Sequence, residues 1–434
     1  MSAARVIGIT HRVKQIVRDG VVQEERPTLV AVLQSHRIVE YALATETDEL
    51  DFVLGRFPSA WRDVTPDEHL GLIPAHHVKW KKHGKEKPEE YAEDHKAFFE
   101  GLWHVAAKVP SAYDGFREGD VLAMILGGSG DRLAYALSRR ADEIGASVYR
   151  VPPFTVKHAR DAASGDKEGD HQLLVTLFGA RPECFRCCGA RDRDLIRVTE
   201  AFRHRMEAQL ERIACAHRLR QRFIGSIFLS PDGKYPEGRI EDAYDQVAAN
   251  DVILSALVAE EKRREAELKK IVQSLDVWQE LFAPIEGVGE MIAARLISAV
   301  GDIRRFETAP KFKAFAGVHV ADGKFVRRRA GTVANWSPTL RQAFYLLGDQ
   351  FNRRPDSVWG KKLREYKAKF RAKYPEPIMG DNGKKRYTDG HIHKMATWRT
   401  ITKFAEWLWR EWTRLERRSF PGVPSVAEPA KKVA

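Results

Sequence analysis

The sequence predicts a mixed architecture, with an α/β domain at the N-terminus and all-α domains after it. Short β-branched runs recur early in the chain, whereas apolar residues recur at helical spacing from about residue 192 onward. We expect an α/β domain over 1–175 with an insertion at about 64–112, then a helical arm over 176–281. A helical domain over 282–375 and a Trp-rich C-terminal helix with a flexible tail over 376–434 follow.

The strands of the first domain are expected at 5–10, 28–33 and 36–41, and again at 120–126 and 147–151. The last two flank a glycine-rich turn, Gly127 to Gly130, and a helix, an order that implies a parallel strand pair. The turn can be interpreted as a phosphate loop, but it lacks the lysine of that motif, which favours a plain strand-to-helix turn. One helix is expected in the polar insertion, near 91–107.

The composition favours a polyanionic partner. The 434 residues include 72 Lys and Arg against 60 Asp and Glu, a formal charge of +12. The sequence has no apolar run of bilayer length and 1–19 lacks a signal-peptide core, so we expect a cytoplasmic location and no membrane partner. Four cysteines are too few for a disulfide framework, and Cys184 with Cys187 forms either half of a zinc site or a reduced turn.

The helical arm carries an apolar seam with acids at its middle. Leu254, Val258, Leu268, Val272 and Leu275 follow alternating steps of three and four residues, and Glu261 and Glu265 interrupt them. Two interpretations remain open, a coiled-coil dimer and packing of the arm within its own chain.

The segment 282–301 has the most specific pattern in the chain. Gly287, Val288 and Gly289 separate two helical stretches, and the glycines expose successive amides at a helix N-terminus, which can bind a DNA phosphate. This pattern is a helix-hairpin-helix signature, which reads phosphates rather than bases. The alternative is an ordinary tight helical hairpin, because Glu286 places a negative charge beside the glycines.

Basic residues follow the hairpin. The candidate DNA contacts are Lys324, Arg327, Arg328, Arg329 and Arg341. A second basic block over 353–373 interleaves Trp359, Tyr366 and Phe370, which either stack on bases or belong to a solvated amphipathic helix. The apolar side of the last helix, which includes Phe404 and Trp412, is expected to be core.

The stretch 284–317 resembles the insertion-sequence 110/116/902 family of transposases, which includes the pilin-gene invertases. The likeness rests on the GxG at 287–289, Ala-Ala-x-Leu at 293–296, Gly-Asp-Ile-x-Arg-Phe at 301–306 and Phe-Ala-Gly at 315–317. The resemblance implies an RNase H-like N-terminal domain that holds Mg²⁺ through four carboxylates, and a second domain that supplies a nucleophilic serine. It also implies DNA as partner, a guide RNA in some members, homo-oligomers and nucleoid association.

Several positions depart from the family pattern. Thr10 replaces the first carboxylate and Met124 lies where the second is expected, which leaves Asp166 and Asp170 as candidate catalytic and metal-binding residues. These two could hold one ion if Asp114, Glu118 or Asp120 assisted. The position of the family serine is Asp322, and the nearest serine is Ser337.

Three hypotheses follow: a divergent transposase or site-specific recombinase, a relative that binds DNA or structured RNA without cleavage, and a structural or junction-binding protein whose arm and Trp-rich tail assemble subunits. The family resemblance supports the first. The substitutions at 10, 124 and 322 favour the second.

Overall fold

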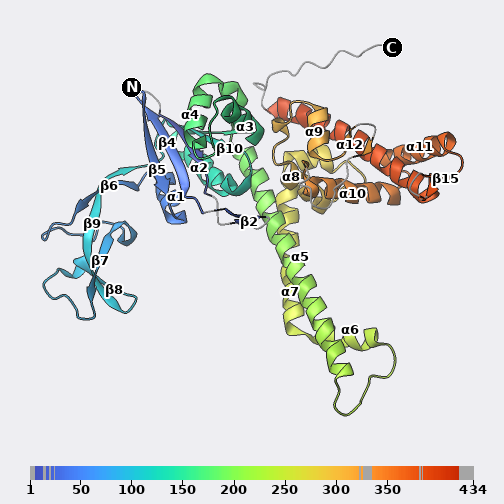
Figure 1. Ribbon diagram of the computed structural model, residues 1–434, viewed down its shortest axis with the longest axis horizontal. Helices are drawn as coiled ribbons and strands as arrows, with labels where there is room; N and C mark the ends of the chain where they lie inside the picture. Colours follow the sequence, from blue (N-terminus) through green and yellow to red (C-terminus); the bar gives the residue numbers. More distant parts are fainter. Residues whose placement is uncertain are drawn as a thin grey trace. The chain divides into compact units, whose positions relative to one another are not determined.

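The computed structural model describes residues 5–12, 16–18, 21–23, 25–321, 324–325, 335–380, 383 and 385–419 (Figure 1). Its internal contacts divide the chain into two compact units, Met1–Arg193 and Asp194–Ala434. The first unit mixes strands and helices, and the second is built almost entirely of helices. The predicted combination of an α/β part with an all-α part is confirmed. No helix in these residues is long and apolar enough to cross a membrane.

A six-stranded sheet organises the first unit, in the order β12-β11-β10-β1-β4-β5. Strands β1, β10 and β11 run parallel, and β4, β5 and β12 join as antiparallel neighbours. The five strands expected from the sequence are confirmed. Their bounds are β1 Val6–Thr10, β4 Thr28–Gln34, β5 Arg37–Leu43, β10 Val121–Ile125 and β11 Ser147–Val151, and β12 is Arg186–Cys187.

Helices cover both faces of this sheet, because alternate residues of each strand point to opposite sides. Leu122 belongs to a core cluster that includes residues of α1 and α2, while its neighbour Ala123 belongs to one that includes residues of α3 and α4. Helix α4 lies so close to β1 that a Cβ at Gly8 would come within 2.0 Å of the His171 carbonyl oxygen. The helices are α1 Glu46–Val53, α2 Asp131–Ile144, α3 Pro153–Ala162 and α4 Asp170–Ala180.

A second, four-stranded antiparallel sheet spans the predicted insertion and begins before it, at residue 57. Strand β9 (Leu102–Asp114) pairs with β6 (Phe57–Asp63), β7 (Lys79–Gly84) and β8 (Lys96–Phe99). The prediction of a helix near 91–107 is therefore wrong. That window spans two strands and the tight turn between them, where Glu100 and Gly101 both have positive φ. Helical periodicity cannot reveal such a hairpin.

Short elements complete the first unit. They are the two-stranded pair β2 Ile16–Arg18 and β3 Val21–Gln23, and the 3-10 turns η1 Ala75–His77, η2 Glu93–His95, η3 Gly128–Gly130 and η4 Pro182–Cys184. The described cysteines are all free thiols, with Cys184 half-buried and Cys187 exposed.

The helical arm of the second unit is formed by α5 (Ala190–Phe228) and α7 (Val252–Gln273), which lie side by side with α6 (Ile240–Asn250) at the far end (Figure 1). The acids that interrupt the apolar seam are neutralised within the chain. Glu261 is buried and receives hydrogen bonds or ion pairs from Arg205 and Arg212 of α5, and Glu265 pairs with Arg205. The seam therefore packs against α5 of its own chain.

The rest of the second unit is a helical body around one aromatic-rich core. Helix α12 contributes Ile401, Phe404, Leu408 and Trp412, all fully buried, so the apolar side of the last helix is core as predicted. The helices are α8 Glu290–Val300, α9 Ala309–Phe315, α10 Pro338–Arg353, α11 Val358–Lys373 and α12 Asp389–Ser419, with a π-helical turn η5 Trp278–Phe282 and a 3-10 turn η6 Ile303–Arg305. Two short strand pairs join them, β13 Val320–Ala321 with β14 Lys324–Phe325 and β15 Ile378–Met379 with β16 Lys385–Arg386.

Candidate nucleic-acid interface

The two candidate carboxylates of the first unit have different environments. Asp170 opens α4, is 3% exposed, and accepts hydrogen bonds from Arg160 on both oxygens, each at 2.8 Å. The Asp170 carboxylate in turn raises the pKa of Arg160. Asp166 is exposed, and one of its oxygens accepts the backbone amides of Glu168 and Gly169. Asp166 thus holds a turn, and Asp170 holds an arginine.

The residues at these positions do not fit a Mg²⁺ site, which takes octahedral oxygen ligands and usually one or two carboxylates. Thr10 and Met124 offer no charge, and Met124 is 1% exposed in the apolar core. Two of the three carboxylates that could have assisted are engaged elsewhere, since Arg5 donates to Asp114 at 2.8 Å and to Asp120 at 2.7 and 2.9 Å, and the third, Glu118, is exposed. A reaction step through Mg²⁺ does not follow from this arrangement.

One group of three side chains among the described residues has the geometry of a metal site. The Nε2 atoms of His76 and His77 lie 3.0 and 2.7 Å from one carboxylate oxygen of Asp51. Burial works to raise the pKa of Asp51, but hydrogen bonds from His77, Arg56 and His76 lower it overall. An Asp–His–His set could hold a zinc-like ion, although Arg56 already donates to the other oxygen of Asp51 at 2.8 Å.

The hairpin of the second unit is the turn at 287–289, which lies between the π-helical turn η5 and helix α8. Gly287 has φ +97°, whereas Gly289 is in the extended region and is the N-cap of α8. Val288 is buried and its amide donates to the Ile285 carbonyl, so it anchors the turn. Gly289 is exposed, and a Cβ added there would meet open space. The backbone at Gly289 is thus accessible to a ligand.

Charged side chains surround the hairpin. Arg354, at the end of α10, lies over Gly287, where an added Cβ would come within 3.3 Å of the Arg354 Cδ. On the other side, Glu290 lies in the first turn of α8. Its own backbone amide and then Gln273, which donates at 2.7 Å, lower the pKa of Glu290. The Glu290 carboxylate therefore weakens the attraction of this helix N-terminus for an external anion. Glu286 is a second, exposed acid beside it.

The predicted basic contacts fall mostly outside the described residues. Asp322 and the arginines at 327, 328 and 329 lie outside them, and of Lys324 only the backbone, in β14, is described. Arg341 lies on α10, with its guanidinium 5.1 Å from the ring centroid of Trp336 and 5.2 Å from that of Trp398. Ser337 is the N-cap of α10 and accepts the Leu340 amide. Arg341 thus joins an aromatic stack, and Ser337 has a structural role.

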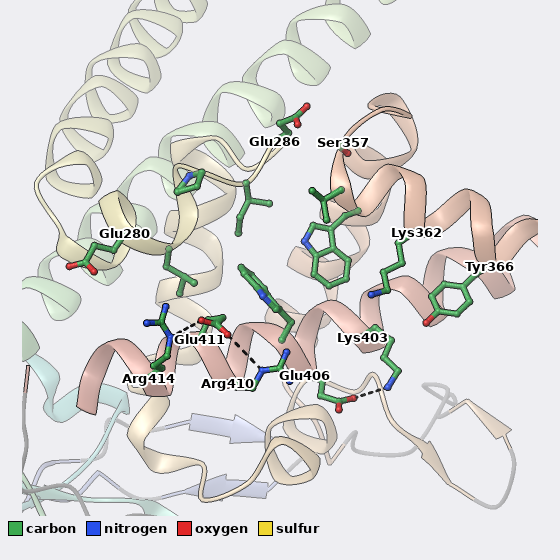
Figure 2. Close-up of a pocket in the computed structure, with 16 residues that line it drawn as sticks. Glu280, Glu286, Ser357, Lys362, Tyr366, Lys403, Glu406, Arg410, Glu411 and Arg414 are labelled. Carbon is green, nitrogen blue, oxygen red and sulfur yellow. Dashed lines mark hydrogen bonds and ion pairs between the residues drawn. The ribbon is translucent and has the colours of Figure 1, made fainter. Parts of the chain in front are cut away.

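A groove of about 610 Å³ opens beside the hairpin, between the turn at 284–286 and helices α11 and α12 (Figure 2). Trp359 and Trp407 line it and contact each other edge to face at 5.8 Å. Its cationic side chains are Lys362, Lys403, Arg410 and Arg414, and its acidic ones are Glu280, Glu286, Glu406 and Glu411. Several of these side chains form ion pairs within helix α12, such as Lys403 with Glu406 and Arg414 with Glu411. The lining therefore carries equal numbers of cationic and acidic side chains.

The comparison with known families identifies this part of the chain. Residues 279–359 match the model of the family described as Transposase IS116/IS110/IS902 family. This segment, called the matched segment below, is similar to that transposase family. The family resemblance predicted from the sequence is confirmed. A comparison with curated proteins found no match.

The motif residues that carry the transposase-family resemblance are mainly structural. Asp302 caps η6 by accepting the Arg304 amide and is paired with the Arg304 guanidinium at 2.8 Å. Gly317, at φ +64°, lies flat against Trp336, and a Cβ there would come within 2.6 Å of the indole ring. Ile303 is fully buried. These positions shape the matched segment from within, so the resemblance reports its fold more directly than its chemistry.

Sequence reasoning missed two features of these sites. The Asp51 cluster joins a helix to a turn about 25 residues later, with no metal-binding spacing to signal it apart from the adjacent histidines. Trp359, considered as a base-stacking residue, is 8% exposed and packs against Phe351, Phe404 and Trp407. The sequence signal for this burial was its apolar spacing with Leu363 on α11.

Proposed function

We propose that this chain is the DNA-binding transposase or site-specific recombinase of an insertion sequence, acting in DNA transposition or recombination. The observation that carries the proposal is the match of residues 279–359 to the transposase family, over the same segment that contains the Gly287–Gly289 hairpin. DNA is the proposed partner, together with a guide RNA and further copies of the chain. A cytoplasmic, nucleoid-associated location is part of the same proposal.

The two units have distinct proposed roles. An RNase H-like fold for the first unit is supported by its strand order, in which three antiparallel strands, β5, β4 and β1, continue into the parallel strands β10 and β11. For the second unit we propose a helix-hairpin-helix domain, in which the accessible backbone at Gly289 contacts phosphates. The basic residues Lys324, Arg327, Arg328, Arg329 and Arg341 remain proposed DNA contacts.

A charge reversal beside the hairpin tests DNA binding. Glu286→Lys replaces an exposed acid next to Gly287, and Glu237→Lys makes the same change of net charge in the exposed turn between α5 and α6. If DNA binds at the hairpin, Glu286→Lys tightens binding to duplex DNA and steepens the dependence of log K on log salt by up to about 0.9 for each additional phosphate that the chain neutralises. Glu237→Lys leaves both quantities near those of the unaltered chain. Equal responses of the two variants in fluorescence anisotropy would place DNA elsewhere.

The second candidate is a relative that binds DNA or structured RNA without strand cleavage. It is favoured by the Arg160 pair on Asp170 and by the uncharged Thr10 and Met124. Cleavage and strand transfer of supercoiled and branched DNA, with Mg²⁺ or Mn²⁺, separate the candidates. Metal-dependent products that disappear in the Asp166→Ala/Asp170→Ala variant support a catalytic carboxylate site. Salt-sensitive binding without product supports the binding-only relative.

A further inference from the structure

A serine, a histidine and a glutamate form a hydrogen-bonded chain in the first unit. The Oγ of Ser129 lies 2.9 Å from the Nδ1 of His11, and the Nε2 of His11 lies 3.3 Å from an oxygen of Glu49. Thr28 donates its hydroxyl to the same oxygen of Glu49 at 2.6 Å, and Arg12 approaches it at 3.6 Å. Three residues far apart in the sequence thus form one line of polar contacts.

The exposure of the three side chains decreases from Ser129 through His11 to Glu49. Ser129 is exposed, while the side chains of His11 and Glu49 are only 14% and 9% exposed. A neutral imidazole that donates Nε2–H to the Glu49 carboxylate presents the lone pair of Nδ1 to the serine hydroxyl. The hydroxyl is therefore open to a substrate, and its proton has an acceptor.

The backbone places Ser129 at the carboxyl edge of the sheet. His11 follows β1 and Ser129 follows β10, and these strands are adjacent and parallel, so their carboxyl ends meet. Gly127 and Gly128 have φ of +87° and +82°, which brings the chain sharply round into α2. Gly130 allows the close approach of His11, since a Cβ there would lie 3.2 Å from the His11 Cβ.

An ordinary structural role for Ser129 would be to cap α2, because serine at a helix start usually accepts an amide of the first turn. The N-cap of α2 is instead Gly130, with no side-chain cap. The Ser129 hydroxyl is directed to His11, with a longer contact of 3.4 Å to the Arg12 carbonyl. The first-turn amides of α2 are thereby left to face an incoming anion.

From this geometry we propose that Ser129 is a nucleophile, with His11 as its general base and Glu49 as the residue that positions His11, and that its substrate is a DNA phosphodiester. The choice of DNA rests on the proposed function, and the activated serine does not. The Ser129 oxygen forms a bond to phosphorus as its proton passes to His11 Nδ1. The bond from phosphorus to the leaving strand's oxygen breaks, and that oxygen takes the proton from His11. The result is a phosphoserine-linked strand and a free hydroxyl end.

The test of the serine uses a biotinylated fluorophosphonate on the full chain, without DNA. Attack by Ser129 forms the oxygen–phosphorus bond and releases fluoride. Intact mass and peptide mapping detect the resulting adduct on the protein. The unaltered chain labels at Ser129, and Ser129→Ala abolishes that label. His11→Gln slows labelling by about 10²-fold or more, the range for loss of a general base. Ser226→Ala, which removes an exposed serine on α5, labels at the unaltered rate.

The positioning role of Glu49 needs its own readout. Glu49→Gln slows labelling and Glu49→Asp recovers part of the rate, because the shorter acid still accepts from the imidazole. A merely structural Glu49 would instead change the thermal midpoint in parallel with the rate in both variants. Labelling that is absent in the unaltered chain, or unaffected by Ser129→Ala, overturns the nucleophile.

The substrate is tested separately with supercoiled plasmid DNA in the presence of EDTA. The products are separated on denaturing gels, and the protein is then analysed by mass spectrometry. A nucleotide covalently attached to Ser129 supports the phosphodiester substrate. Labelling by the fluorophosphonate without such an adduct, in a chain that binds DNA, overturns the choice of substrate and leaves DNA binding intact. Salt-sensitive DNA binding with no labelling overturns the relay alone, whereas labelling without DNA binding counts against the proposed function.

Discussion

Replacing Arg160 with methionine removes the partner of a buried carboxylate and keeps much of the side chain's apolar bulk. Asp170 is 3% exposed and receives two hydrogen bonds of 2.8 Å from Arg160, whose side chain is 14% exposed. Loss of one partner from a buried ion pair costs about 3–5 kcal/mol, and the partial exposure of Arg160 favours the lower end. For a unit of 193 residues this lowers the unfolding midpoint by about 6–12 °C.

Calorimetry of the full chain measures this effect, with Asp166→Asn as the matched control. Asp166 is exposed and accepts two amides through one oxygen, which the asparagine carbonyl can replace, so we expect a shift below about 2 °C. The reasoning is refuted if Arg160→Met leaves the midpoint unchanged while Mg²⁺ stabilises the unaltered chain but not Asp170→Asn. That pattern would mean that Asp170 holds a metal ion rather than an arginine.

Four further outcomes test the packing and charge of the two units. Glu261→Gln lowers the stability of the arm by about 2–3 kcal/mol because it removes the buried carboxylate that pairs with the half-buried Arg205 and Arg212, whereas Glu267→Gln at an exposed position changes it by less than about 0.5 kcal/mol in urea unfolding. Burial and a hydrogen bond to Asp114 raise the pKa of Tyr41 to about 12, so its stabilisation is complete below the unfolded pKa near 10 and is lost as the pH rises toward 12. Tyr41→Phe should flatten this alkaline loss, and an unchanged profile would contradict the contact. Burial works to raise the pKa of Asp114, but its partners lower it overall, so its stabilisation is present above the ordinary carboxyl range and is lost as the pH falls below about 4. Trp412→Ala opens a cavity at a fully buried site and costs about 3–5 kcal/mol, while Trp412→Phe should cost clearly less.

Periodicity was sufficient for the elements with regular burial. The central strands of the first unit are short and apolar, and the last helix repeats its apolar residues at helical steps, so both followed from pattern alone. The sheet at 57–114 did not follow, because its strands are rich in charge and its turn at Glu100 and Gly101 carries no strong hairpin dipeptide. Local sequence therefore described the core better than the partly exposed second sheet.

The candidate sites also divide into features that could be predicted from the sequence and features that could not. The difference is whether the residues are close together in the sequence. The hairpin at Gly287 is local in sequence, so its backbone could be inferred from the glycines. His11, Glu49 and Ser129 become neighbours only once β1 and β10 pair and α1 packs beside them, a fact of topology that no local pattern contains. The engagement of Asp170 by Arg160 also required three-dimensional placement, although the ten-residue separation is short.

The buried acid of the arm has a mechanical consequence. A seam of aliphatic side chains can slide by one turn with little change in packing, but Glu261 between Arg205 and Arg212 has only one axial position where both guanidiniums reach it. A slip of one turn, about 5.4 Å, would separate Glu261 from at least one of these two guanidiniums. Helix α7 has 22 residues and spans about 33 Å. This ionic contact therefore fixes the axial register of α7 against α5. The register in turn sets how far α6, at the end of the arm, lies from the helical body.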